Sequence, residues 1–271
     1  MTFYEKMAAI WRKSDSMVCV GLDPDLAKMP ECVKNEKYPF FAFNKALVDA
    51  THDLVCAYKP QAAYYAGQNA DDQLAMTIEY IKTNYPDVPV ILDVKRGDIG
   101  STAAQYAKEA FVRYNADAVT VNPYMGSDAL KPFLDYADRG VIILCRTSNA
   151  GGNDLQNLVC DGMPIYEHVA VLTRDKYNYN QNAALVIGAT YPEELGRIRS
   201  ICPELPFLVP GVGAQGGDVA KVLEHGLASN GYGLIINSSR GIIYASNGDD
   251  FAEAARNATI KLRDLIRSCR P

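Results

Sequence analysis

Histidine is scarce in this chain of 271 residues, which contains only His52, His168 and His225. No two of them are close in sequence, so a histidine-rich metal site or a Ser-His-Asp triad has little material to draw on. The seven cysteines are scattered and never spaced Cys-x-x-Cys. This usage favours reduced thiols in the cytosol over a disulfide framework.

Long hydrophobic runs and an excess of positive charge are also lacking. No run approaches the roughly 20 apolar residues that span a bilayer, and the segment Met1–Lys6 lacks the apolar core of a signal peptide. A formal net charge of −5 argues against a general binder of nucleic acid or of membrane surfaces. We therefore expect a cytoplasmic protein that binds neither.

No Pro/Ser-rich linker or low-complexity tract divides the chain. Short apolar strands alternate instead with amphipathic helical stretches. The predicted strands are Met17–Asp23, Val55–Pro60, Val88–Lys95, Ala118–Asn122, Gly140–Arg146, Ala184–Thr190, Pro206–Val212 and Gly233–Ser238. The predicted helices are Tyr4–Lys13, Phe40–Asp53, Ala70–Tyr85, Ser101–Asn115, Asp128–Asp138, Pro164–Asn178, Pro192–Ile201, Gly217–Ser229 and Asp249–Arg267.

Eight strand–helix units without a linker predict one α/β domain over residues 1–271, a closed (β/α)₈ TIM barrel with an extra N-terminal helix. A doubly wound open sheet is the alternative, because a count of strands does not prove closure. In a barrel the active site lies at the carboxyl ends of the strands. Chemically useful residues should therefore gather there.

The most informative of these strand ends is Asp93-Val94-Lys95-Arg96-Gly97-Asp98, which follows the apolar run Val88–Leu92. Side chains two apart on a strand share a face, so Asp93 and Lys95 should point the same way. Charges at the end of a buried strand are costly to desolvate. We interpret them as functional, with structural ion pairing as the plain alternative.

A second group of residues suits a phosphate. The glycines between Gly211 and Gly217 would let backbone N–H groups approach an anion, and a helix that starts near Gly217 would add its positive end. Gln215 offers an amide donor, and Arg240 a bidentate one just after the last strand. The alternative is two ordinary turns and a surface arginine.

Taken together, these motifs closely resemble orotidine 5′-monophosphate decarboxylase, in particular its longer sequence group. The resemblance covers nearly the whole chain in the expected order. Its matching pieces are Gly21–Pro24, Tyr58–Pro60, Asp93–Thr102, Cys145–Asn149, Pro210–Gly217 and Ser239–Gly241. The Asp-x-Lys-x-x-Asp element is shared with sugar-phosphate relatives and identifies only the superfamily. Lys59, the Ser148 segment and the Pro210–Gly217 loop make the match specific.

The resemblance implies a cofactor-free and metal-free loss of carbon dioxide from orotidine 5′-monophosphate, giving UMP. Lys95 would stabilise the ring carbanion and donate the proton to carbon 6, beside Asp93. Flanking carboxylates favour the charged ammonium that this requires. In a homodimer, Asp98 would complete the array from the partner subunit, and Ile99 and Thr102 would cross the interface with it.

The resemblance also implies the substrate contacts. Asp23 and Lys59 would bind the ribose, and Lys59 would also contact the charged array. Ser148 would bind the amide edge of the pyrimidine. The phosphate would be bound by Pro210, Gly211, Gln215, Ser239 and Arg240. Ala150 stands where a proline is common in this group. The insertion Asn149–Met163 is a lid or a plain surface excursion, and Lys28–Pro39 has no assigned role.

Three rival functions fit parts of the pattern. A metal-dependent sugar-phosphate aldolase or β-keto acid decarboxylase would use the carboxylates as ligands. A Schiff-base aldolase would need Lys95 as a neutral amine, which Asp93 and Asp98 disfavour. A barrel that only binds a phosphorylated ligand would need no chemistry at all.

Overall fold

The computed structural model describes residues 1–212 and 217–270. Its centre is an eight-stranded parallel sheet in the order β2-β1-β10-β9-β8-β5-β4-β3. The bridges Tyr58↔Val90 and Gln61↔Asp93 join the two edge strands, β2 and β3. The sheet thus closes on itself, which confirms the (β/α)₈ barrel over the open doubly wound sheet. Its strands are β1 (Val18–Leu22), β2 (Ala57–Pro60), β3 (Ile91–Arg96), β4 (Ala118–Val121), β5 (Gly140–Arg146), β8 (Ala183–Ile187), β9 (Phe207–Pro210) and β10 (Leu234–Ser238).

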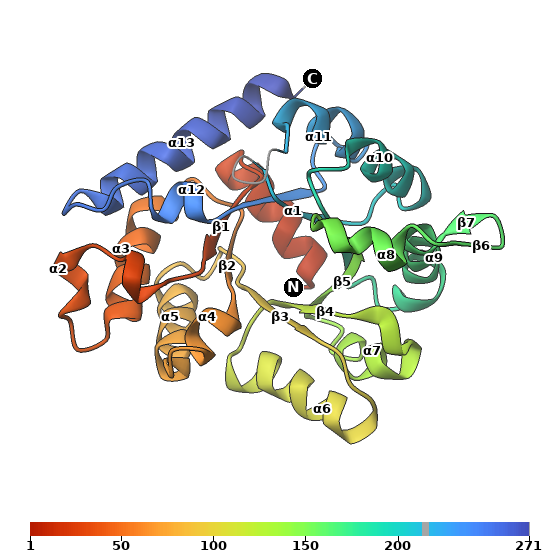
Figure 1. The fold of residues 1–271 in the computed structure, drawn as a ribbon, viewed down its shortest axis with the longest axis horizontal. Coiled ribbons are helices and arrows are strands. Elements are labelled where there is room, and N and C mark those ends of the chain that lie inside the picture. The colour runs from red at the N-terminus through yellow and green to blue at the C-terminus, as the bar shows by residue number, and fades with distance from the viewer. Residues whose placement is uncertain (213–216, 271) are drawn as a thin grey trace.

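Helices form a ring around the strands (Figure 1). Their inward faces bury apolar side chains against the outside of the barrel, whose strands are buried on both sides and consequently read as continuous apolar runs. The longer helices are α1 (Phe3–Ser14), α3 (Pro39–Thr51), α5 (Asp71–Asn84), α6 (Gly100–Lys108), α7 (Ser127–Leu134), α9 (Ile165–Leu172), α10 (Pro192–Ile201), α11 (Val219–Gly226) and α13 (Phe251–Cys269).

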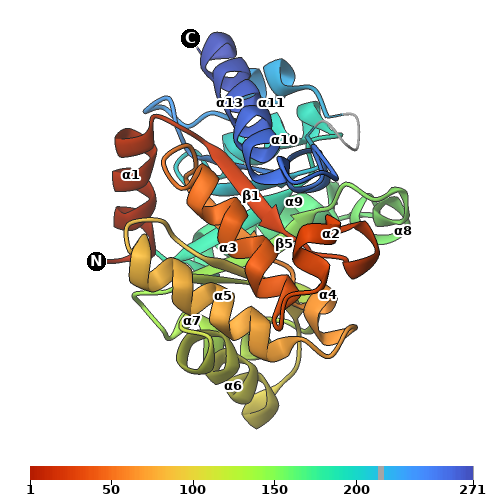
Figure 2. The same cartoon turned by 90° about the vertical axis from the view of Figure 1, so that its left-hand side faces the viewer.

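The extra N-terminal helix covers the amino end of the barrel. Thr2 caps α1 through a capping box with Glu5. Lys6 pairs with the buried carboxylate of Asp117, just before β4, at 2.6 Å, and the ring of Phe3 packs so closely on Gly140 that no side chain fits there. Figure 2 shows α1 at one end of the barrel, while β1 points toward the other. The carboxyl ends of the strands therefore remain open for a site.

The two insertions lie at that open end, with α2, α4 and α8 in Figure 2. The segment 28–39 contains the short helix α2 (Glu31–Lys34), and α4 (Ala62–Ala66) follows β2. The segment 149–163 folds as α8 (Asn153–Gln156) and leads into a small hairpin of β6 (Val159–Cys160) and β7 (Met163–Pro164). A last short helix, α12 (Arg240–Ile243), follows β10. Periodicity did not predict these elements, because each is too short to show a period.

Candidate active site

Three charged side chains meet at the carboxyl ends of β2 and β3. The Asp93 carboxylate receives Lys59 Nζ at 3.0 Å on Oδ2 and Lys95 Nζ at 2.7 Å on Oδ1. Lys59 and Asp93 are buried, whereas the Lys95 side chain is 46% exposed at the open mouth. The Lys59, Asp93 and Lys95 part of the expected charged array is therefore brought together by one chain, with one ammonium accessible to a ligand.

The cluster is held in its charged form by its own members. Burial alone would raise the pKa of the Asp93 carboxyl, but Lys59 and Lys95 outweigh it and hold that pKa well below its usual range. Burial would likewise lower the pKa of the Lys59 ammonium, yet Asp93 and Asp23 raise it above its usual value. Lys59 and Asp93 therefore form a buried ion pair.

Polar atoms without partners lie beside this cluster, at the ends of β1 and β10. In the described part of the chain, Asp23 Oδ1, Asn237 Oδ1 and Ser239 Oγ are buried and accept or donate no hydrogen bond. Gly21 lies against them, since a Cβ there would come within 2.8 Å of Ser239 Cβ. Buried polar atoms normally form at least one hydrogen bond. Ligand hydroxyl groups would supply donors to the two acceptor oxygens of Asp23 and Asn237, and the Ser239 hydroxyl could donate to an anion.

The three residues expected at a subunit interface lie on the surface of the single chain. Ile99 is 51% exposed, and Thr102 on α6 is exposed as well. Asp98 Oδ1 accepts the Ile99 N–H at 2.8 Å, and no ion pair joins Asp98 to Lys59 or Lys95 within residues 1–212 and 217–270. Within a single chain, Asp93 therefore pairs with Lys95, whereas Asp98 does not.

The phosphate group of residues is described only in part. Gln215 lies outside the described residues. Gly211 has a φ of +97°, a conformation that favours glycine, and Pro210 ends β9 beside it. Arg240 is exposed and opens α12 directly after Ser239.

One expectation about this region, that the next helix binds the anion at its N-terminus, gains no support from the cap of that helix. The helix after the glycine loop was expected to offer its N-terminus to the anion, but Asp218 caps α11 itself. Its carboxylate accepts the N–H groups of Ala220 at 2.9 Å and Lys221 at 3.4 Å. An aspartate at the N-cap both occupies these donors and places a negative charge there.

Ser148 follows β5 and lies close to β8. Its backbone packs against Gly188 so tightly that a Cβ on Gly188 would come within 2.7 Å of Ser148 Cα. Glycine at 188 is thus required by this close approach. Ser148 is half-buried at the strand ends, on the opposite side of the barrel from β1 and β2. Its contact with the pyrimidine stays a prediction.

Arg146 is a residue whose importance sequence reasoning missed. Its side chain is completely buried, forms an ion pair with Glu194 and stacks over the ring of Tyr191, 3.8 Å from the centroid. Its Nη2 also donates to Asn153 Oδ1 at 2.6 Å, and its Nη1 to Gln156 Oε1 at 3.2 Å. Arg146 thus anchors α8, and with it the 149–163 insertion, to the barrel. An arginine that ends a predicted buried strand was the available signal.

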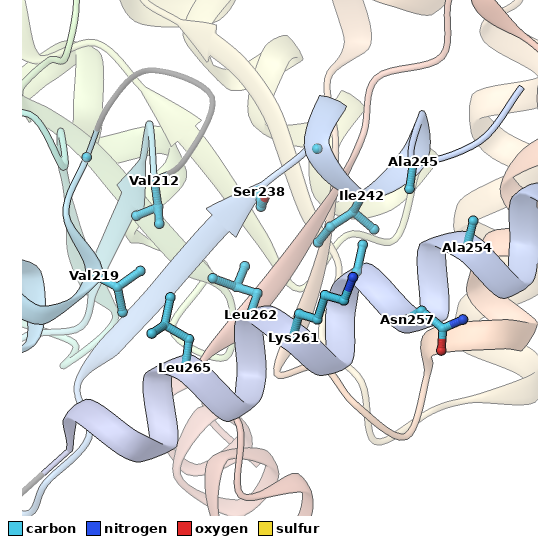
Figure 3. A pocket seen from close by; sticks show the side chains of 13 residues that line it. Val212, Val219, Ser238, Ile242, Ala245, Ala254, Asn257, Lys261, Leu262 and Leu265 are labelled. Carbon is cyan, nitrogen blue, oxygen red and sulfur yellow. The ribbon is translucent and has the colours of Figure 1, made fainter.

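One cavity lies apart from the charged cluster. It measures about 790 Å³ and lies between α13 and the ends of β9 and β10 (Figure 3). Its walls are mainly aliphatic, and Lys261 supplies their one titratable side chain. We place the candidate site at the cluster, because several charged side chains meet there, whereas the described lining of the cavity brings no second charged group to Lys261.

Two further findings concern metal ligands and membrane-spanning helices. Within residues 1–212 and 217–270, no three His, Cys, Asp or Glu side chains are grouped so that they could hold a metal ion. In the same ranges, no helix combines the length and apolar character needed to cross a membrane.

Comparison with known proteins adds independent evidence. Residues 16–256 match the model of the orotidine 5′-phosphate decarboxylase / HUMPS family. The chain is 57% identical over 272 residues to orotidine 5′-phosphate decarboxylase from Cellvibrio japonicus, with 100% of both chains covered. It is 54% identical to the enzyme of that name from Janthinobacterium sp., with 98% of each covered.

Solved structures agree in fold. The structure of Leishmania donovani OMP decarboxylase matches with a TM-score of 0.85 and 38% identity, covering 100% of this chain and 99% of that one. A putative orotidine-monophosphate decarboxylase from Toxoplasma gondii matches with a TM-score of 0.85 and 35% identity, covering 99% and 98%.

Proposed function

The chain belongs to the orotidine 5′-phosphate decarboxylase family, and from this premise we propose that it is a carbon–carbon lyase converting orotidine 5′-monophosphate to UMP and carbon dioxide. This is the last step of de novo pyrimidine nucleotide synthesis. The observation that carries the proposal at the level of residues is the array of Lys59, Asp93 and Lys95, with one ammonium facing the open mouth.

The chemistry follows from that array. The bond between carbon 6 and the carboxylate breaks, its electron pair stays on carbon 6, and carbon dioxide leaves. The Lys95 ammonium stabilises this charge as it develops and transfers its proton to carbon 6. Asp93 keeps a negative charge against Lys95 and makes the position beside it unfavourable for the substrate's carboxylate. The half-exposed Lys95 amine regains its proton from solvent.

No step of this reaction calls for an electron carrier or a Lewis acid, so we propose that the enzyme uses neither cofactor nor metal. The metal-dependent rival would place a cation among carboxylates. In this cluster, two ammonium groups surround a single carboxylate, an arrangement that repels a metal ion. The Schiff-base rival needs a neutral amine, which an aspartate at 2.7 Å disfavours.

The remaining site residues are proposed to bind the substrate. Asp23 and Lys59 would hold the ribose hydroxyls, and the unpartnered buried Asp23 Oδ1 supports a role as acceptor. Ser148 would meet the amide edge of the pyrimidine. The phosphate would lie against Pro210, Gly211, Gln215, Ser239 and Arg240.

We further propose a homodimer in which Asp98, Ile99 and Thr102 complete the neighbouring site. Apolar side chains exposed after the neighbouring strands β3 and β4 support this: Ile99 is 51% exposed in the connection after β3, and Tyr124 is 78% exposed in the connection after β4. Exposed apolar groups gathered in this way are typical of interaction surfaces. Asp98, which forms no ion pair with Lys95 of its own chain within residues 1–212 and 217–270, would then be available to the partner.

The decisive experiment mixes the purified protein with orotidine 5′-monophosphate in the presence of a chelator and follows the loss of ultraviolet absorbance. We expect turnover. Absence of turnover with the chelator, together with turnover of a sugar phosphate after magnesium is added, would favour the metal-dependent rival. Borohydride trapping of substrate on Lys95 would favour the Schiff-base aldolase. Binding without any turnover would leave a phosphate-binding barrel.

A further inference from the structure

Strand β3, which carries the candidate proton donor Lys95, is irregular at residues 93–95. β3 pairs with β4 in the register Leu92↔Val119 and then Arg96↔Val121, so that residues 93–95 stand opposite Thr120 alone. Lys95 has a φ of +47°, in the left-handed region that a lysine rarely adopts. A bulge of this kind loses regular ladder hydrogen bonds and re-aims a side chain. Something else must hold its backbone.

Thr120 provides that support. It is completely buried in β4. Its Oγ1 accepts the backbone N–H groups of Val94 and Lys95, each at 3.0 Å, and donates to Asp93 Oδ1 at 2.7 Å. A hydroxyl has one proton and two acceptor positions. All of them are used, and every partner belongs to the bulge.

The same contacts connect the two charged groups of the site. Asp93 Oδ1 receives both the Thr120 hydroxyl and the Lys95 ammonium, the latter at 2.7 Å. Thr120 therefore touches the backbone of the lysine and the counterion of its amine at once. Within residues 1–212 and 217–270, no other side chain forms hydrogen bonds both with the backbone N–H of Lys95 and with the carboxylate of Asp93.

We propose that Thr120 is a positioning residue, which holds the bulge so that Lys95 Nζ lies at the reacting carbon; this inference rests on the proposed decarboxylase function. Valine has the shape of threonine without the hydroxyl. With valine, the two backbone donors lose their acceptor and Asp93 Oδ1 loses one of its two donors, so Lys95 is free to leave its left-handed conformation. A displacement of about 1 Å at a reacting group costs about a hundredfold in rate.

The test compares T120V, T120S and the control T259V. Thr259 is also completely buried, and its hydroxyl donates to the Ala255 carbonyl within α13 at 2.7 Å. Both valine variants thus lose a buried hydroxyl, but only one loses it at the bulge. Turnover per folded protein, KM, and affinity for UMP are measured for each, and folding is followed by circular dichroism and urea unfolding.

We expect kcat of T120V to fall about a hundredfold, with KM and UMP affinity within about threefold of wild type. T120S keeps the hydroxyl and should retain most of kcat, while T259V should lose stability without losing kcat. A kcat of T120V within threefold of wild type, or a T120S as impaired as T120V, would overturn the inference. Equal losses in kcat and in UMP affinity would overturn it too.

The experiment also distinguishes a failure of T120V to fold from a failure of the positioning role, and that from a failure of the proposed function. If T120V does not fold, T120A replaces it: kcat of T120A well below that of T120S supports the role of the hydroxyl, and equal values refute it. A wild-type chain that turns over orotidine 5′-monophosphate beside an unimpaired T120V refutes only the positioning role. A wild-type chain without turnover refutes the proposed function and the inference with it.

Discussion

Replacing Lys59 with methionine tests how the charged cluster affects stability as well as activity. The Lys59 ammonium lies 3.0 Å from Asp93 Oδ2, and both side chains are buried. At an effective dielectric constant of 20 their attraction is about 5 kcal/mol, most of which offsets the desolvation of the two charges. Methionine keeps most of the apolar stem of the side chain but leaves Asp93 with one cation fewer.

We expect Lys59→Met to lower the free energy of unfolding by about 3 kcal/mol, the low end for breaking a buried pair. The low end applies because Lys95 and Thr120 still contact Asp93. For a chain of this size the midpoint of thermal unfolding should fall by about 6 to 12 °C. Turnover should also be lost, since Lys59 is part of the proposed array.

The measurement is equilibrium unfolding in urea at one protein concentration, on Lys59→Met, Asp93→Asn and the double variant. If the two residues form a buried pair, the double variant should be about as stable as either single one, because no unpaired charge remains. Lys13→Met is the matched control. Lys13 pairs with Asp87 at 2.6 Å, but both side chains are about two-thirds exposed, so the loss should stay below about 1 kcal/mol. Additive losses in the double variant, or equal losses for the two methionine variants, would refute the reasoning.

Four other predictions concern the same site. Lys95→Ala should lower kcat by about 10⁴-fold or more while the chain stays folded, because both the cation and the proton are removed; near-normal turnover in the absorbance assay would contradict the mechanism. Arg240→Ala should lower kcat/KM for the phosphorylated substrate by about 10- to 100-fold and leave that for the bare nucleoside unchanged; an equal loss for both would exclude a phosphate contact. Mixing Lys95→Ala with Asp98→Ala chains should restore part of the activity in verified heterodimers, and a strictly inactive mixture would count against a shared site. Because the pKa of Asp93 is lowered by folding, its ionisation stabilises the protein above the usual aspartate pKa of about 4 and ceases to do so as the pH falls through and below that value. The difference in unfolding free energy between wild type and Asp93→Asn should therefore shrink between about pH 5 and pH 2, and a difference independent of pH would contradict it.

The sequence alone determined the fold and the identity of the main charged residues. Strands buried on both faces appear as uninterrupted apolar runs, so all eight were predicted to within a few residues, and Gly140–Arg146 with its observed bounds. Because parallel strands present their carboxyl ends at one edge, Lys59, Asp93 and Lys95 were expected together. The ion pairs at 3.0 and 2.7 Å confirm that expectation.

Tertiary structure decided which residues support that cluster. Thr120 reads as an ordinary β-branched strand residue, and only the register of β3 against β4 shows its hydroxyl serving a bulge. Arg146 reads as the end of a strand, and only the packing of α8 and α10 around it shows a buried anchor. Such roles depend on partners 7 to 48 residues away or on a local shift of register. Periodicity and motif spacing do not predict such contacts, because both describe only residues that are close along the chain.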